Sequence, residues 1–216
     1  HADEKKVRDL LKKDKYFAPQ LDDPKVTYDS DANTISILLA GKAGPTVNIV
    51  VDSPKGKVSS GTQTRLLAIK REGTLDFSAI VEGERRLENY YQEKGYFFAD
   101  VKPLCSSVPP VVDTENVPIA NETEFLCSFL GGEDLTGRNV QVKYSVDLGR
   151  RFTLTKLQIK GTDKLTIEDV RTVLTSQEAN IFGIIPILGY GHGYTSAAIL
   201  EDDAATIKSL MSELGS

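Results

Sequence analysis

The sequence contains few of the residues from which catalytic centres and metal sites are built. Its 216 residues include two histidines, two cysteines, one methionine and no tryptophan. His192 is the only histidine besides the first residue, so a histidine pair or triad cannot be assembled within the chain. No CxxC pair or His/Cys cluster indicates a metal site. We therefore expect no catalytic residues, no cofactor and no metal, and a binding protein rather than an enzyme.

Long apolar runs and an excess of positive charge are also missing. No stretch approaches the roughly 18 consecutive apolar residues that a membrane-spanning helix needs. With 31 acidic and 26 basic residues, the net charge is -5, which argues against attraction to nucleic-acid phosphates or to anionic lipid surfaces. Nucleic acid is thus an unexpected partner. The 40% of hydrophobic residues is enough to build cores, and the length suits one to three domains.

The two cysteines leave two interpretations open. Cys105 and Cys127 enclose a proline-rich, polar segment that has little else to hold it in place. A disulfide closing a loop of about twenty residues would stabilise the fold by about 3 kcal/mol, and it persists only in an oxidising compartment. The alternative is a pair of reduced thiols in a cytosolic protein.

An internal repeat organises the chain. Residues 44–56 and 149–161 each begin and end with glycine, and each has apolar residues three and five positions after the first glycine. Ahead of the two copies, residues 34–39 and 139–146 alternate between apolar and polar side chains. This alternation predicts half-buried strands, each leading through a glycine-marked bend into a further strand.

A helical pattern recurs three times, with apolar residues at positions i, i+3 and i+4 that form one face of a helix. The three sets are Val7, Leu10 and Leu11; Leu87, Tyr90 and Tyr91; and Ile207, Leu210 and Met211. After the central set, Gly95 is placed to end the helix in the left-handed conformation. A further helix is predicted from a capping box at residues 166–169, with Ile167, Val170 and Leu174 pointing inward.

These elements predict an α+β fold of tandem modules. Each complete module has the order β-α-α-β-β, with a three-stranded mixed sheet and two helices on one of its faces. Residues 1–46 form the C-terminal part of a first module, and residues 47–150 form a complete module with an insertion at about 105–137. Residues 151–216 form the N-terminal part of a third module, with an extended loop at 179–194.

Two stretches carry a resemblance to a known family. The pattern of Leu87, Tyr90, Tyr91, Gly95, Tyr96, Phe97, Ala99 and Val101 resembles the second helix and following strand of a POTRA domain. Residues 149–161 resemble the junction between two such domains. The family comprises the BamA/TamA-like outer-membrane β-barrel assembly (surface antigen) proteins. The resemblance implies a periplasmic location ahead of a C-terminal transmembrane β-barrel that lies outside this sequence. The implied partners are unfolded outer-membrane proteins or accessory lipoproteins.

If the sheet order resembles that of the family, the strand after the second helix lies at an edge. The predicted peptide-binding residues are Ala99, Asp100, Val101, Lys102 and Leu104. An extended polypeptide could pair with them by β-augmentation, which makes little demand on sequence. Pro103 removes one donor and limits how far the pairing can run. The alternative is that the 105–137 insertion covers this edge.

Four further features receive structural interpretations. The glycine-rich residues 189–194 are expected to form a flexible loop, and the apolar run 181–188 is expected to pack in a core or between modules. The acidic residues 201–203 fit the start of a helix, where negative charge favours the helix dipole. The glycosylation acceptor pattern at 121–123 is assigned no role, since it would have no meaning in a bacterial periplasm.

The leading functional hypothesis is a periplasmic polypeptide-binding arm of an outer-membrane protein assembly or translocation factor. A second hypothesis is the POTRA arm of a two-partner secretion transporter, which recognises one dedicated exported substrate. A third is a structural or cell-division scaffold that carries a POTRA-like module, although the three tandem copies count against it.

Overall fold

The computed structural model describes residues 2–111, 127, 130, 134–160, 165–179 and 193–213. They form two compact units, one of residues 1–84 with 102–145 and the other of residues 85–101 with 146–216. The dividing lines cross a helix and two strands, so this division does not test the predicted module boundaries after residues 46 and 150. The elements are α1 (Ala2–Lys13), β1 (Gln20–Leu21), β2 (Lys25–Asp29), β3 (Thr34–Leu38), β4 (Gly41–Lys42), β5 (Thr46–Asp52), α2 (Ser60–Leu66), α3 (Ala68–Glu72), α4 (Phe77–Gln92), β6 (Asp100–Val108), β7 (Asn139–Asp147), α5 (Ile167–Val170) and α6 (Ala197–Glu213).

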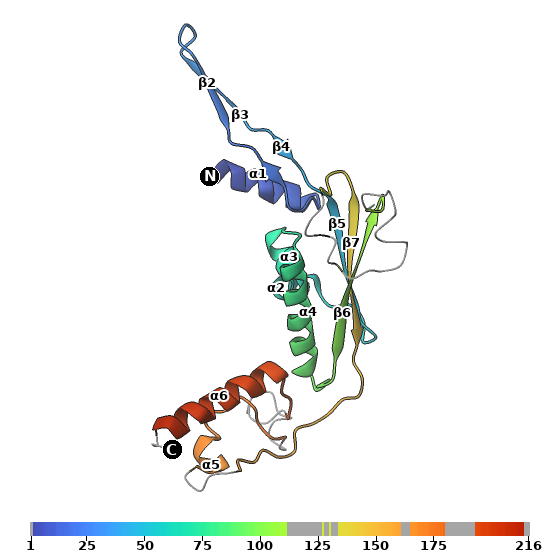
Figure 1. The fold of residues 1–216 in the computed structure, drawn as a ribbon, viewed down its shortest axis with the longest axis vertical. Helices are drawn as coiled ribbons and strands as arrows, with labels where there is room; N and C mark the ends of the chain where they lie inside the picture. Colours follow the sequence, from blue (N-terminus) through green and yellow to red (C-terminus); the bar gives the residue numbers. More distant parts are fainter. Residues whose placement is uncertain are drawn as a thin grey trace. The chain divides into compact units, whose positions relative to one another are not determined.

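The main sheet has the strand order β5-β7-β6, and helices α2, α3 and α4 lie on one side of it (Figure 1). Strand β5 pairs with β7 in parallel, from Thr46 opposite Asn139 to Asp52 opposite Ser145. The order of strands and helices confirms the predicted α+β fold with a three-stranded mixed sheet. One detail differs, because the first helix is divided into α2 and α3 at Leu67, whose backbone is extended (φ -98°, ψ 107°).

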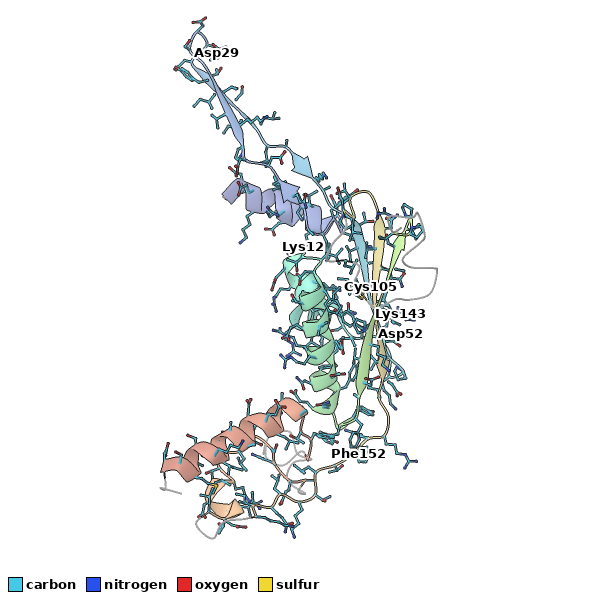
Figure 2. All side chains as sticks on the ribbon, in the orientation of Figure 1. Lys12, Asp29, Asp52, Cys105, Lys143 and Phe152 are labelled. Carbon is cyan, nitrogen blue, oxygen red and sulfur yellow. A yellow bond between two sulfur atoms is a disulfide. The ribbon has the colours of Figure 1, made fainter. Side chains whose placement is uncertain are left out.

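Alternation along the strands separates the two faces of the sheet. Every second residue of β7, starting at Val140, is buried. On the intervening positions, Lys143 Nζ lies 3.6 Å from the carboxylate of Asp52 on β5, and Figure 2 labels both side chains. The predicted half-buried strand at residues 139–146 is therefore confirmed.

Tyr144 is the largest fully buried side chain of this sheet. Its hydroxyl donates a hydrogen bond to the carbonyl oxygen of Ile80 on α4, at 3.2 Å. Burial, with a smaller contribution from Glu84, raises the pKa of Tyr144 far above its ordinary value. Helix α4 comes this close because residue 83 is glycine: a Cβ there would lie 2.6 Å from Tyr144 Oη and 3.1 Å from Leu67 Cδ2.

Helix α4 ends as the sequence predicts. Gly95 adopts a φ of +93°, and the N–H of Tyr96 donates to the carbonyl of Tyr91 at 3.1 Å. The chain then reverses its direction and continues into β6. The left-handed glycine thus sets the position at which the edge strand begins.

The two-stranded ribbon of β2 and β3, which precedes this sheet in the chain, differs from the prediction in its burial. Strands β2 and β3 pair antiparallel, from Lys25 opposite Leu38 to Asp29 opposite Thr34. All ten of their residues are exposed, so the prediction of a half-buried strand at 34–39 is wrong. Alternation buries one face only where another layer packs on it, and this two-stranded ribbon lacks such a layer among the described residues.

The predicted strand after Gly149 is also wrong, since residues 148–160 have no regular secondary structure. Their N–H groups bond to separate partners instead of to one neighbouring strand. Phe152 N donates to Gly95 O and Leu154 N to Gly193 O, both at 2.7 Å. Leu157 N donates to Glu178 Oε1 at 2.6 Å. Residue 161 of the repeat lies outside the described residues.

The capping box at residues 166–169 is present. Thr166 N and Thr166 Oγ1 both lie within hydrogen-bond distance of Asp169 Oδ2, at 2.8 and 2.7 Å. Val170 and Leu174 are buried with Leu165, as predicted, although α5 itself has only four residues. The core is completed by partly buried residues that include the predicted apolar face of α6: Ile159, Ile167, Ile207, Leu210 and Met211.

Asp203 differs from the dipole interpretation of residues 201–203. It lies in the second turn of α6 and is 6% exposed. Its two carboxylate oxygens accept the N–H groups of Thr175 and Ser176, both at 2.8 Å. Asp203 therefore joins α6 to the segment after α5, and its role is to satisfy buried main-chain donors.

We predict that Gly83→Ala destabilises the protein by about 1 to 3 kcal/mol, because the added methyl group meets Tyr144 in a packed core. The loss should shrink in a Tyr144→Phe background, which removes the hydroxyl. Urea unfolding measures both. Gly61→Ala in α2 is the matched control, since its Cβ meets nothing within 4 Å and should stabilise by up to about 1 kcal/mol. Equal effects of the two substitutions would contradict the close contact.

Candidate functional site

The five predicted peptide-binding residues lie on or beside one edge strand. Ala99 directly precedes β6, and the other four lie within it. The order of the described strands places β6 at one edge of the sheet and β5 at the other. Along β6, Asp100 and Lys102 are exposed, whereas the alternate side chains Val101, Pro103, Cys105 and Ser107 are buried. The strand thus anchors one row of side chains in the core.

The two edges of the sheet are not equivalent. At the start of β5, Val47 N donates to the carbonyl of Lys15 at 2.8 Å, and Tyr16 forms an antiparallel bridge with Thr46. The chain after α1 therefore covers the beginning of this edge. Strand β6 has no such bridge among the described residues.

Glu88 on α4 contacts the main chain of β6. Its Oε1 accepts the N–H of Val101 at 3.3 Å. Burial raises the pKa of Glu88, the Val101 hydrogen bond opposes that shift, and the nearby Asp100 adds to it. Sequence patterns gave no sign of this residue, because the contact joins positions 13 apart across a turn.

Cys105 and Cys127 form a disulfide. Cys105 lies on β6 (Figure 2), and both cysteines have no exposed surface. The bond ties the insertion to the edge strand, with 22 residues of sequence separation. Main-chain oxygens of Pro109 and Pro110 also accept hydrogen bonds from Arg138, at 2.7 and 2.8 Å.

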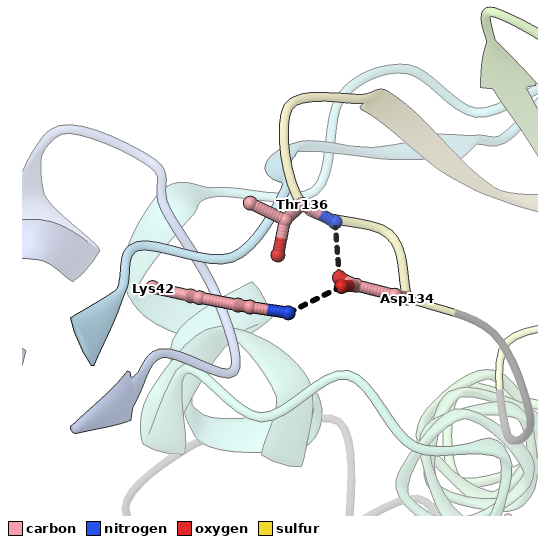
Figure 3. A network of polar contacts seen from close by, with 3 residues as sticks. All are labelled: Lys42, Asp134 and Thr136. Carbon is pink, nitrogen blue, oxygen red and sulfur yellow. Dashed lines mark hydrogen bonds and ion pairs between the residues drawn. The ribbon is translucent and has the colours of Figure 1, made fainter. Parts of the chain in front are cut away.

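A polar cluster lies at the end of the sheet where β5 and β7 begin. Lys42 Nζ lies 2.6 Å from Asp134 Oδ2, and Thr136 N donates to Asp134 Oδ1 at 3.0 Å (Figure 3). The hydrogen bond from Lys42, followed by those from Thr136, holds the pKa of Asp134 well below its usual range. The same contact raises the pKa of Lys42. This pair joins β4 to the segment that leads into β7.

An apolar cleft of about 280 Å³ lies within the second unit. Phe98 and Phe152 meet edge to face across it, with ring centroids 5.2 Å apart, and both rings are substantially exposed. The lining residues are Gln92, Gly95, Phe97, Phe98, Phe152, Thr153, Leu154, Gly193, Tyr194, Thr195 and Leu200. The cleft has the size and apolar character to hold one or two side chains.

Several sequence candidates fall outside the described residues, namely His192, the apolar run 181–188 and the acceptor pattern 121–123. Within the described ranges, no three His, Cys, Asp or Glu side chains gather in a way that could hold a metal ion. Across the same residues, none of the helices has the length and apolar character to cross a membrane.

We predict that replacing both cysteines by alanine lowers the free energy of unfolding by about 3 kcal/mol, because the closed loop restricts the unfolded chain. Thermal unfolding with and without dithiothreitol is the measurement. Reductant should lower the melting temperature of the unaltered protein and leave the double variant unchanged. A reductant-insensitive parent protein would contradict this role.

We predict that the Lys42–Asp134 pair makes stability pH dependent at both extremes. The depressed pKa of Asp134 contributes stability that is present above its ordinary value of 3.8 and lost as the pH falls toward the folded value. The raised pKa of Lys42 contributes stability below 10.5 that is lost as the pH rises through the folded value. Because these side chains are 55% and 59% exposed, solvent screening keeps the effect small.

Urea midpoints of Asp134→Asn, measured from about pH 2 to 6, should fall less steeply on acidification than those of the parent. Lys42→Met should also weaken the dependence of the urea midpoint on pH. The double variant should show the same pH dependence as the single variant with the larger effect. Parallel profiles for the parent and Asp134→Asn would exclude the pair as a source of acid sensitivity.

Comparison with known proteins identifies the domain that contains β6. Residues 46–124 match the family model described as POTRA, surface antigen variable number repeat. The match begins at the first residue of β5 and ends ahead of β7, which the structure adds to the same sheet. None of the curated proteins matches the chain.

A solved structure, the crystal structure of Haemophilus influenzae BamA POTRA3-5, is similar at 16% sequence identity and a TM-score of 0.40. The similarity covers 91% of this chain and 63% of that chain, so this sequence spans less than two thirds of its length. Because this likeness is distant, the assignment rests on the family match together with the β-α-α-β-β order. Residues 46–124 are therefore identified as a POTRA domain, whose sheet β7 completes.

Proposed function

We propose that this chain is a periplasmic polypeptide-binding arm of an outer-membrane protein assembly or translocation factor. It holds extended segments of client proteins by β-augmentation on β6, positions partners for a transmembrane β-barrel and catalyses no reaction. The observation that carries the proposal is the edge position of β6 in the POTRA sheet. Clients are unfolded outer-membrane proteins, and accessory lipoproteins are further partners.

The asymmetry of the sheet supports β6 as the receiving edge. An added strand needs a row of outward main-chain groups. The bridge from Tyr16 to Thr46 and the bond from Val47 to Lys15 occupy the beginning of the β5 edge. On β6, the side chains of alternate residues are buried in the core, which holds the strand in place while its outer edge is engaged.

The disulfide supports the compartment. Cys105 and Cys127 are both buried and joined, and such a bond forms and persists in an oxidising environment. A periplasm provides that environment. The match to a surface-antigen repeat points to the same location.

We predict that extended peptides from several unrelated outer-membrane β-strands shift the amide resonances of β6 in the ¹⁵N-labelled full chain. Main-chain pairing requires donors and acceptors on one edge of the peptide only. N-methylation of the alternate amides that face β6 should abolish the shifts, and N-methylation of the opposite set should leave them intact.

This matched pair of peptides separates strand pairing from apolar adhesion. Equal binding of the two methylated peptides, or an absence of shifts in β6, would exclude β-augmentation at this strand. A response to one peptide only would favour the arm of a two-partner secretion transporter with a dedicated substrate.

A further inference from the structure

The ribbon of β2 and β3 has one strongly apolar face. Val26 lies opposite Ile37, and Tyr28 lies opposite Ile35. Directly opposed residues share a face, as do residues two positions apart in one strand, so these four side chains form one surface. They are between 62% and 69% exposed. Contiguous exposed apolar side chains of this kind mark a surface that contacts another layer.

The second unit has an apolar core with an open side. Leu165, Val170 and Leu174 are buried, and the hydrophobic residues packed around them are only partly buried. None of the described members of this core comes from a strand. A cavity of about 420 Å³ lies beside it, lined in part by Leu157, Ile167 and Leu174. The described part of this core therefore has helices without a covering sheet.

The two surfaces complement each other in structure. Residues 2–42 supply a helix and the ribbon, whereas residues 148–213 supply an irregular segment followed by α5 and α6. In the β-α-α-β-β order, an apolar sheet face packs on two helices. The ribbon has such a face, and α5 with α6 form such a helical layer. Each surface thus matches what the other one lacks.

Charge favours the same pairing. Residues 22–41 contain four aspartates and one lysine, and Figure 2 labels Asp29 at the turn of the ribbon. Residues 148–160, which lead to the α5–α6 core, contain two arginines, two lysines and no acidic residue. The charged side chains of both segments are exposed. An acidic ribbon attracts this basic segment and repels a second acidic ribbon, so pairing of two ribbons is disfavoured.

We infer that the apolar face of the ribbon docks on the open side of the α5–α6 core of a second copy of this chain. The side chain of Tyr28 enters the cavity beside Leu157, and the acidic residues of the ribbon face the basic residues of 148–160. The contact uses a different surface on each molecule, so every pair keeps one free ribbon and one free core. It goes beyond the proposed client binding and does not use β6.

The size of the ribbon limits the strength of this contact. It has ten residues, compared with roughly 20 to 30 residues on each side of a standard stable interface. We therefore expect weak association, with a Kd of about 10 to 100 µM. A row of associated molecules places several copies of β6 near one another, which raises the effective concentration of client sites.

Sedimentation equilibrium of the full chain, at about 5 to 500 µM protein, tests the apolar contact. Ile37→Ser removes an apolar side chain from the docking face and should raise the Kd roughly tenfold. Leu38→Ser is the matched control, because Leu38 is 63% exposed and alternates to the opposite face of the same strand. It should leave the Kd unchanged. Circular dichroism checks that both variants are folded.

Charge exchange tests which surfaces meet. Asp23→Lys/Asp31→Lys makes the ribbon basic, and Lys156→Glu/Lys160→Glu makes the segment beside the core acidic. Each variant opposes like charges and should lose association at low salt. An equimolar mixture of the two variants should associate again, because each ribbon then meets a segment of opposite charge on the other variant. Asp29 is left unchanged, since its carboxylate accepts main-chain N–H groups in the turn.

A parent chain that stays monomeric up to about 500 µM would overturn the inference. It would favour another occupant of the core, such as a partner protein or residues 181–188 of the same chain. Equal weakening by Ile37→Ser and Leu38→Ser, or a mixture of the charge variants that stays monomeric, would overturn it as well. None of these outcomes bears on client binding at β6, which the peptide titrations measure separately.

Discussion

The parallel pairing of β5 with β7 is the constraint on which the rest of this structure depends. It joins residues that are more than ninety positions apart, from Thr46 and Asn139 onward. Because β7 lies between β5 and β6, it fixes which strand lies at each edge. It also fixes the face on which Tyr144 is buried and the direction in which each main-chain group points. The Lys42–Asp134 pair lies where this pairing begins, and the disulfide holds the strand on its far side.

The sequence carries much of this arrangement in local signals. The helix ending at Gly95, the alternation at residues 139–146 and the capping box at 166–169 each reflect a few neighbouring residues, and all three are present in the structure. The internal repeat supplied the order of elements. These signals suffice for the fold class because local conformation and burial pattern agree along α4, β6 and β7.

Other features depend on contacts that no local pattern encodes. Alternation at residues 34–38 resembles that of β7, yet no layer covers it among the described residues. The repeat at 149–161 resembles the start of β5, yet its donors bond to Gly95, Gly193 and Glu178 one at a time. At the candidate site, the sequence alone indicated that Pro103 removes one main-chain donor from this strand. The role of Glu88 required the three-dimensional position of α4 beside β6.

The contact between Lys15 and Val47 has a consequence for self-association. A sheet with two open edges can be extended from both sides, and repeated addition produces a fibre. Here the chain covers the start of one edge with its own carbonyl group. The start of β5 is therefore closed to an added strand. A second copy of the sheet could extend it only beyond the covered residues of β5 or along β6.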